Sequence, residues 1–152
     1  LSTHLHSDGK YAKELWLKEP STTSSNRLSK KSIERGDHFI SMNGREVFRH
    51  AVKRFPETIN ECLEHNGLTT EDISLLIPHQ ANLRISNMIQ KKLNLPDNKV
   101  YNNIEKYGNT TAASIPICLS EAKKKGLISN DDLVVCAAFG AGFLWGSAII
   151  KW

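Results

Sequence analysis

The chain has 152 residues, of which 39% are hydrophobic and 7% aromatic, and this is enough apolar material for one domain with a single aliphatic core. Lys and Arg outnumber Asp and Glu by 20 to 16, and the net charge of +4 favours an anionic partner such as nucleic acid, a phosphate-bearing cofactor or an acidic protein. An apolar stretch of about 20 residues that could span a bilayer is missing, and the polar residues 1–9 are unlike a signal peptide, so we expect a soluble protein.

The first half of the chain combines a polar segment with a helical one. Residues 20–37 are rich in Ser, Thr and Asn and have little periodic apolar content, which predicts a mobile surface loop. Residues 45–55 place apolar side chains at helical spacing and basic ones between them, which predicts an amphipathic helix with a basic face. Pro56 either kinks this helix or opens a second one that ends at Asn66-Gly67, and the sequence leaves both alternatives open.

Two strand-to-helix or loop-to-helix junctions follow. The buried-strand signal at residues 75–77 ends at Pro78, and helical spacing resumes at Ile85, so a polar junction lies between them at residues 79–82. A second polar junction, at residues 107–110, precedes a helix that ends at Gly126.

The last third of the chain predicts two adjacent strands. Residues 133–138 are continuously apolar, as expected of a central strand covered on both faces, and a turn at residues 140–142 leads into the apolar run 143–150. The alternation of helices with short buried strands predicts an α/β layered fold, in which ligand sites collect where strands end.

Cysteines and histidines give little sign of a metal or a disulfide. Cys62, Cys118 and Cys136 are odd in number and widely spaced, and each lies among apolar residues, which predicts buried, inert thiols in a reducing cytoplasm. His4 and His6 have a spacing that suits a metal, but no third ligand is evident, so we predict no metal site.

The first polar junction supports two interpretations. A histidine, two amides and an arginine after a buried strand are costly unless hydrogen bonds or ligands satisfy them, which favours a functional site. Equally, His79 could be a satisfied structural histidine and Asn82 the N-cap of the next helix. For Asn82 the two roles are compatible.

Three motifs resemble those of ketoacyl-acyl carrier protein synthase III, a family of thiolase-fold condensing enzymes. Residues 79–85 (His-Gln-Ala-Asn-x-Arg-Ile) are similar to its histidine motif, residues 107–116 to its asparagine motif, and residues 139–146 to its glycine-rich turn. Weaker similarity covers residues 1–9 and 42–48. The order matches the second half of such enzymes, so we expect the chain, 1–152, to be a C-terminal thiolase-like domain with a mixed central sheet flanked by helices, without the N-terminal half that bears the catalytic cysteine.

The resemblance implies a reaction and roles for three residues. The family joins an acyl-CoA starter to malonyl-carrier protein by decarboxylative Claisen condensation and so initiates fatty-acid synthesis. Its implied catalytic residues here are His79 and Asn109, whose Nε2–H and side-chain amide would stabilise the enolate oxygen. The backbone N–H of Ala141 would stabilise the oxyanion of acyl transfer, although a tight turn between strands explains that segment equally well. The family usually has glycine at position 141, so the acyl-chain preference is not predicted.

Substrate and carrier binding are implied at the first junction and at the start of the basic helix. Asn82 would bind the amides of a pantetheine arm, and Arg84 would bind phosphate or carrier carboxylates. The remaining residues implied in binding are Phe48, Gly44, Arg45 and Arg49. A solvated basic face is the commoner explanation for such charges.

The resemblance also implies partners and an alternative. It implies an acyl carrier protein and a coenzyme A thioester as partners, no cofactor beyond these substrates, a homodimer of the full-length cytoplasmic protein, and neither nucleic acid nor membrane. Because the family's nucleophile is a cysteine at a helix N-terminus and none of the three cysteines has that setting, this chain alone is expected to be inactive. The alternatives are a non-catalytic half that binds acyl carriers or a partner subunit, and a related condensing enzyme of secondary metabolism.

Overall fold

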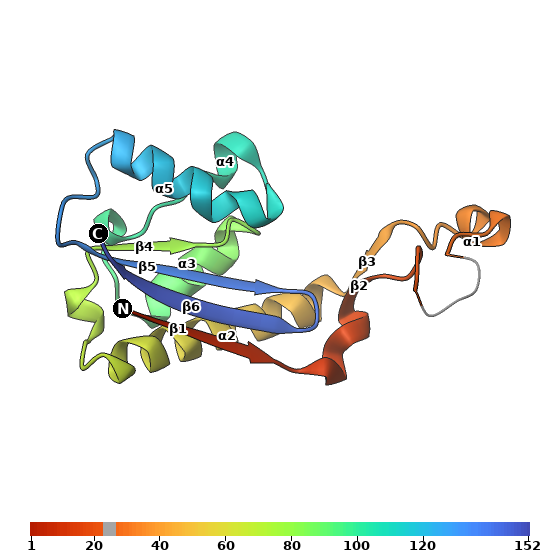
Figure 1. Ribbon diagram of the computed structural model, residues 1–152, viewed down its shortest axis with the longest axis horizontal. Helices are drawn as coiled ribbons and strands as arrows, with labels where there is room; N and C mark the ends of the chain where they lie inside the picture. Colours follow the sequence, from red (N-terminus) through yellow and green to blue (C-terminus); the bar gives the residue numbers. More distant parts are fainter. Residues whose placement is uncertain (23–26) are drawn as a thin grey trace.

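The protein is described by a computed structural model that covers residues 1–22 and 27–152. Its main sheet has four strands in the order β1-β6-β5-β4 (Figure 1). The bounds of these strands are β1 Ser2–Ser7, β4 Leu75–Pro78, β5 Leu133–Gly140 and β6 Leu144–Lys151. β4 and β5 run parallel, whereas β5–β6 and β1–β6 are antiparallel, so the predicted mixed sheet is confirmed.

Helices cover both faces of the sheet, as expected for the predicted α/β fold. Helices α2 (Gly44–His65) and α3 (Leu83–Lys92) pack on the face that carries Val135. Helix α5 (Ser114–Lys124) packs on the opposite face, against Val134. Because neighbouring residues of a strand point to opposite faces, the continuously apolar β5 supplies both cores, and the prediction of a central buried strand is confirmed.

Pro56 lies inside one continuous helix, so of the two alternatives that the sequence left open, the one in which Pro56 opens a second helix is wrong. The helix starts after Asn43, whose side chain caps it, and runs through Pro56 to the predicted stop at Gly67, which has a positive φ of 66°. Pro56 cannot donate to the carbonyl of Val52 four residues earlier. The Lys92 ammonium of α3 donates to that carbonyl instead, at 2.9 Å.

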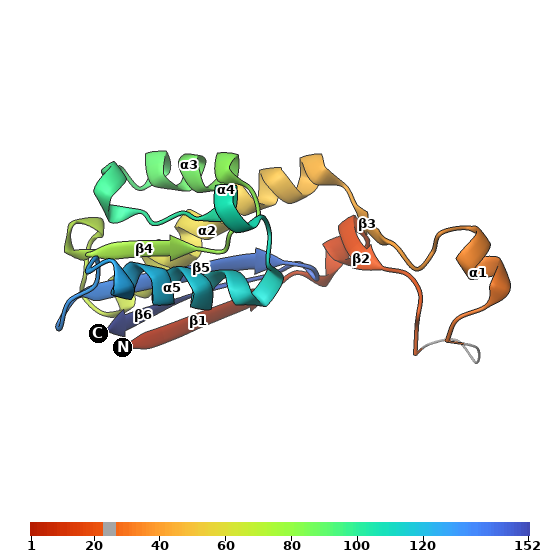
Figure 2. The same cartoon turned by 90° about the horizontal axis from the view of Figure 1, so that it is seen from above.

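An arm projects from the body of the protein (Figures 1 and 2). It contains a two-stranded sheet of β2 (Leu15–Leu17) and β3 (Ile40–Met42) and the short helix α1 (Lys30–Glu34). The prediction that residues 20–37 form only loop is therefore wrong for α1. Its five residues are too few to show apolar periodicity, and a capping box between Ser29 and Ser32 stabilises the helix start. Residues 23–26 of that predicted loop lie outside the described residues.

The crossover from β4 to β5 carries the two predicted polar junctions. Residues 79–82 lie between β4 and α3. Residues 107–110 begin at the last residue of a short helix, α4 (Ile104–Tyr107), that the sequence did not predict. The 3-10 helices are η1 Gly9–Glu14, η2 Thr70–Asp72, η3 Asp97–Lys99 and η4 Thr111–Ala113. In the part of the chain that the structure describes, no helix is long and apolar enough to cross a membrane.

Candidate active site

A cavity of about 1360 Å³ opens beside the carboxyl ends of β4 and β5, between the sheet, α2, α3 and the arm. Eight of the nine residues predicted for catalysis or binding line it. They are Gly44, Arg45, Phe48, His79, Asn82, Arg84, Asn109 and Ala141. The carboxyl end of a parallel strand pair is where α/β folds commonly bind ligands. The ninth residue, Arg49, does not line the cavity.

His79 is the first residue after β4. Its backbone N–H donates to the Ala137 carbonyl at 2.8 Å, which continues the pairing of β4 with β5 and fixes where the side chain leaves the sheet. The ring is half-buried, and its Nδ1 lies 2.6 Å from the Ser114 hydroxyl. Burial lowers the pKa of His79, so the ring is neutral at neutral pH. A neutral ring can donate one hydrogen bond without acting as a base.

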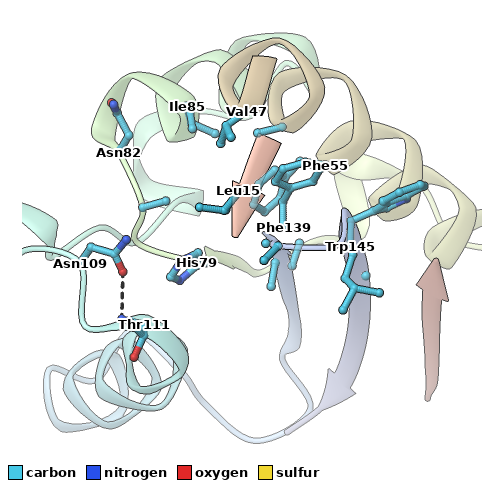
Figure 3. Close-up of a pocket in the computed structure, with 18 of the residues that line it drawn as sticks. Leu15, Val47, Phe55, His79, Asn82, Ile85, Asn109, Thr111, Phe139 and Trp145 are labelled. Atoms are coloured by element: carbon cyan, nitrogen blue, oxygen red, sulfur yellow. Dashed lines mark hydrogen bonds between the residues drawn. The ribbon is translucent and has the colours of Figure 1, made fainter. Parts of the chain in front are cut away.

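Asn109 lies at the same end of the cavity as His79 (Figure 3). Its side-chain oxygen accepts a 2.9 Å hydrogen bond from the Thr111 N–H, the contact drawn as a dashed line. Because the oxygen is occupied, the amide NH₂ remains as the donor end of this exposed side chain. His79 and Asn109 therefore offer two uncharged donor groups to one cavity.

Asn82 is the N-cap of α3, as one of the two interpretations of the sequence predicted. Its side-chain oxygen accepts from the Arg84 N–H at 2.9 Å and so caps α3. Asn82 is exposed and is among the residues that line the cavity, and its amide NH₂ remains as a further donor. The Arg84 guanidinium lies 5.7 Å from the centroid of the Phe48 ring, and both side chains border the cavity together with Arg45. The rim of the cavity is thus cationic on the side of α2 and α3.

Arg49 is held within α2. Its Nε donates to the Glu46 carboxylate at 3.2 Å, and its Nη2 lies 3.0 Å from Nε2 of the buried His50. The hydrogen bond from Arg49 holds the pKa of Glu46 below its usual range. Because Glu46 already pairs with its positive charge, Arg49 should attract an anionic ligand less strongly than Arg45 or Arg84 do.

The Ala141 turn is fixed from outside the hairpin. Ala141 is exposed between β5 and β6, and the following Gly142 has a φ of 137°, which only glycine adopts readily. The N–H and carbonyl of the buried Phe143 pair with the carbonyl and N–H of Asp8, at 2.9 and 2.8 Å. The structural alternative, a tight turn, therefore holds, and it leaves the Ala141 backbone at the cavity.

Sequence reasoning missed the polar network that holds α4 and hence the segment leading to Asn109. The side-chain oxygen of the fully buried Gln80 accepts hydrogen bonds from the backbone N–H groups of Asn103 and Ile104, at 3.0 and 3.1 Å. Glu121 of α5 accepts from Asn103 Nδ2 at 2.9 Å and from the Tyr107 hydroxyl at 2.7 Å. Gln80 could have been found from the sequence, because it belongs to the histidine motif. Nothing in the sequence around Glu121 indicated its role.

Comparison with known proteins shows the family. The family model described as 3-Oxoacyl-[acyl-carrier-protein (ACP)] synthase III C terminal matches residues 63–152, a range that contains all three predicted motifs. The chain belongs to this family. The resemblance stated from the sequence to the C-terminal half of synthase III is therefore confirmed.

The relatives of this chain are about twice as long as the chain itself. Beta-ketoacyl-[acyl-carrier-protein] synthase III of Caldanaerobacter subterraneus subsp. tengcongensis is 47% identical over 152 residues, which are 100% of this chain and 45% of that protein. The crystal structure of 3-oxoacyl-[acyl-carrier-protein] synthase III from Aquifex aeolicus superposes with a TM-score of 0.84 at 39% identity, covering 100% of this chain and 44% of that one. The chain spans about half the length of the curated relatives it matches.

A solved structure of a priming ketosynthase is also similar to this chain. The priming beta-ketosynthase from the R1128 polyketide biosynthetic pathway superposes with a TM-score of 0.81 at 28% identity. The superposition covers 97% of this chain and 43% of that one.

The three cysteines of this chain are all buried, as the sequence predicted. Burial raises the pKa of Cys118 and of Cys136 to about 11, and Cys62 is fully buried in α2. Cys136 is among the residues that line the cavity, but its raised pKa leaves it protonated at neutral pH. Neither Cys118 nor Cys136 is therefore an activated thiolate.

His4 and His6 both contact one carboxylate. His4 Nδ1 and His6 Nε2 lie 3.2 and 2.6 Å from the two oxygens of Glu61. Within residues 1–22 and 27–152, no group of three or more His, Cys, Asp or Glu side chains is arranged to hold a metal ion.

Proposed function

We propose that this chain is the C-terminal half of a 3-oxoacyl-acyl carrier protein synthase III, which condenses an acyl-CoA starter with malonyl-carrier protein and so initiates fatty-acid synthesis. The observation that carries the proposal is the placement of His79, Asn109 and the Ala141 turn around one cavity with a cationic rim. We further propose that residues 1–152 act as one domain and that a cysteine outside this chain serves as the nucleophile.

The first half-reaction is an acyl transfer. The cysteine thiolate attacks the carbonyl of acyl-CoA, a tetrahedral oxyanion forms, and the coenzyme A thiolate leaves. In this proposal the Ala141 N–H donates to the oxyanion, and this position on a turn tied to Asp8 needs no rearrangement during the reaction.

The second half-reaction forms the new carbon–carbon bond. The bond between the malonyl carboxylate and its α-carbon breaks, CO₂ leaves, and the electron pair becomes an enolate on the thioester. His79 Nε2–H and the Asn109 amide donate to the enolate oxygen. The α-carbon then attacks the acyl-cysteine carbonyl and the cysteine thiolate leaves. Both donors are uncharged, so they stabilise the developing negative charge without protonating it beforehand.

Binding is proposed to use the rim of the cavity. Asn82 offers its amide NH₂ to the pantetheine arm, and Arg84 and Arg45 attract the phosphate of coenzyme A or the acidic carrier. Phe48 and Gly44 line the entrance beside them. Arg49 is proposed to contribute through the overall positive charge of α2, because Glu46 already pairs with it. We also propose a homodimer in the cytoplasm that needs no cofactor beyond its substrates.

The likeness to the R1128 priming ketosynthase favours one alternative within the same reaction class, a condensing enzyme of secondary metabolism with another starter. A different class of function is a non-catalytic half that binds acyl carriers or a partner subunit. Cys118 and Cys136, which a raised pKa keeps protonated, fit both alternatives as well as the main proposal.

The test is an assay of the protein expressed from its complete reading frame. Malonyl-carrier decarboxylation and acyl condensation are measured for the wild type and for His79→Ala and Asn109→Ala. Each substitution removes one donor and should lower the condensation rate roughly 100- to 1,000-fold. His65→Ala and Asn87→Ala, at exposed helical positions away from the cavity lining, are the matched controls. Absence of activity over a broad set of starters and carriers would favour the non-catalytic half.

A further inference from the structure

Ser114 is the first residue of α5 and is 1% exposed. Its hydroxyl oxygen lies 2.6 Å from His79 Nδ1 and 3.2 Å from the backbone nitrogen of Gln80. A buried hydroxyl that contacts two consecutive residues of the histidine motif is well placed to control the ring of His79. The motif itself did not point to Ser114, because 35 residues separate it from His79.

The directions of these two hydrogen bonds follow from counting protons. The backbone N–H of Gln80 can only donate, so the Ser114 oxygen accepts there. The hydroxyl has one proton left to donate, and among residues 1–22 and 27–152 the only further partner of this oxygen is His79 Nδ1. If Nδ1 carried the proton and donated instead, the hydroxyl proton would have no acceptor among those residues, so the arrangement that satisfies every group has Nδ1 accepting and the proton of the neutral imidazole on Nε2.

Two features keep the ring neutral, which the proton count requires. The ring is half-buried, and burial lowers the pKa of His79. The N-terminus of α5, an eleven-residue helix that starts at Ser114, presents its positive dipole end to the same ring. Both disfavour a second proton on the imidazole.

We propose that Ser114 is a positioning residue that fixes His79 in the Nε2–H tautomer and aims this proton into the cavity. The inference rests on the proposed function for its consequence, since the Nε2–H is the donor that the enolate needs. Without the Ser114 hydroxyl, Nδ1 has no donor facing it, and the ring is free to take either tautomer and to rotate.

The test reads the tautomer directly. In the full-length protein labelled with ¹⁵N-histidine, long-range ¹H–¹⁵N spectra distinguish protonated from unprotonated ring nitrogens, and the His79 signals are assigned by their loss in His79→Gln. Wild type should show an unprotonated Nδ1 and a protonated Nε2. Ser114→Ala should show a mixture, and its condensation rate should fall roughly 10- to 100-fold, as for other partners that set a histidine tautomer. Ser114→Thr, which keeps the hydroxyl, should retain the wild-type tautomer.

Thr58→Val is the matched control, because Thr58 is also 1% exposed and loses only a hydroxyl contact to Ser147. It should lower stability without changing the His79 spectrum. A protonated Nδ1 in the wild type, or an unchanged His79 spectrum in folded Ser114→Ala, would overturn the proposal whatever the activity. A wild type with the expected tautomer but no condensation would instead contradict the proposed function and leave the assignment of Ser114 in place.

Discussion

The Tyr107 hydroxyl donates a 2.7 Å hydrogen bond to the Glu121 carboxylate and so joins the last residue of α4 to α5. Asn109 follows two residues later. Because Gln80 holds the other end of α4 beside His79, the two proposed enolate donors are linked through one short helix. Disturbing α4 should therefore affect Asn109 before it affects the sheet.

We expect Glu121→Gln to weaken this link and to change the acid stability of the protein. Hydrogen bonds from Asn103 and Tyr107 lower the pKa of Glu121 from its ordinary value of 4.5 to about 2. A depressed carboxylate pKa stabilises the folded state above about pH 4.5, and the contribution is lost as the pH falls toward 2. Melting temperature measured against pH should fall less steeply over this window in Glu121→Gln. The exposed Glu64→Gln is the control and should follow the wild-type curve.

The carbonyl that Pro56 leaves without a helical donor gives a second prediction. Lys92→Met removes the ammonium that donates to Val52 and should cost about 0.5–1 kcal/mol of unfolding free energy. In a Pro56→Ala background, the restored N–H of residue 56 can donate to the same carbonyl, so the cost of Lys92→Met should shrink. Urea unfolding of the four variants measures this coupling. Equal costs in both backgrounds would show that Lys92 does not replace the missing helical donor.

Arg84 and Arg49 should differ, because Arg84 lines the cavity and Arg49 does not. Arg84→Ala should raise KM for a carrier-linked substrate roughly tenfold, the equivalent of one charge-assisted hydrogen bond. Arg49→Ala should change KM little, because its charge is already paired with Glu46. Steady-state kinetics at low and high salt measures both effects, and salt should reduce the difference. A larger effect at Arg49 would contradict the carrier-binding assignment.

The buried thiols should resist alkylation. With a pKa of about 11, Cys118 and Cys136 have about one thiolate in a thousand at pH 8. Mass spectrometry after brief treatment with iodoacetamide should find neither residue labelled in the folded protein and both labelled in denaturant. Labelling of Cys136 in the folded protein would show that the cavity exposes it more than its burial indicates.

The sequence predicted the elements whose apolar pattern is local. β5 and the junction at His79 were predicted correctly, because a continuous apolar run and a Pro-terminated strand need no knowledge of partners. β1 was not predicted, because its half-buried positions hold polar residues such as His4 and His6 while Leu5 is exposed. β1 nonetheless pairs with β6 along its whole length, and both histidines contact the Glu61 carboxylate of α2.

Within the candidate site, the sequence identified the groups that face the cavity better than those that hold them. Arg45 and Arg49 are one helical turn apart, and the sequence does not distinguish them. In the structure Arg49 donates a hydrogen bond to the Glu46 carboxylate. Ser114 contacts His79, 35 residues earlier in the chain, and Glu121 contacts Tyr107, 14 residues earlier. Such contacts depend on how α5 docks, and local periodicity does not encode docking.

The parallel pairing of β4 with β5 also has a kinetic consequence. Leu133 and Ser74, where these strands begin to meet, are 59 residues apart in sequence, and the crossover between the strands holds both His79 and Asn109. Closing so long a loop reduces the entropy of the chain before the strand contacts form and stabilise it. Contacts of this kind therefore slow folding. The cavity should therefore be among the last parts of the protein to form during refolding, after α2 and the β5–β6 hairpin, which are built from local contacts.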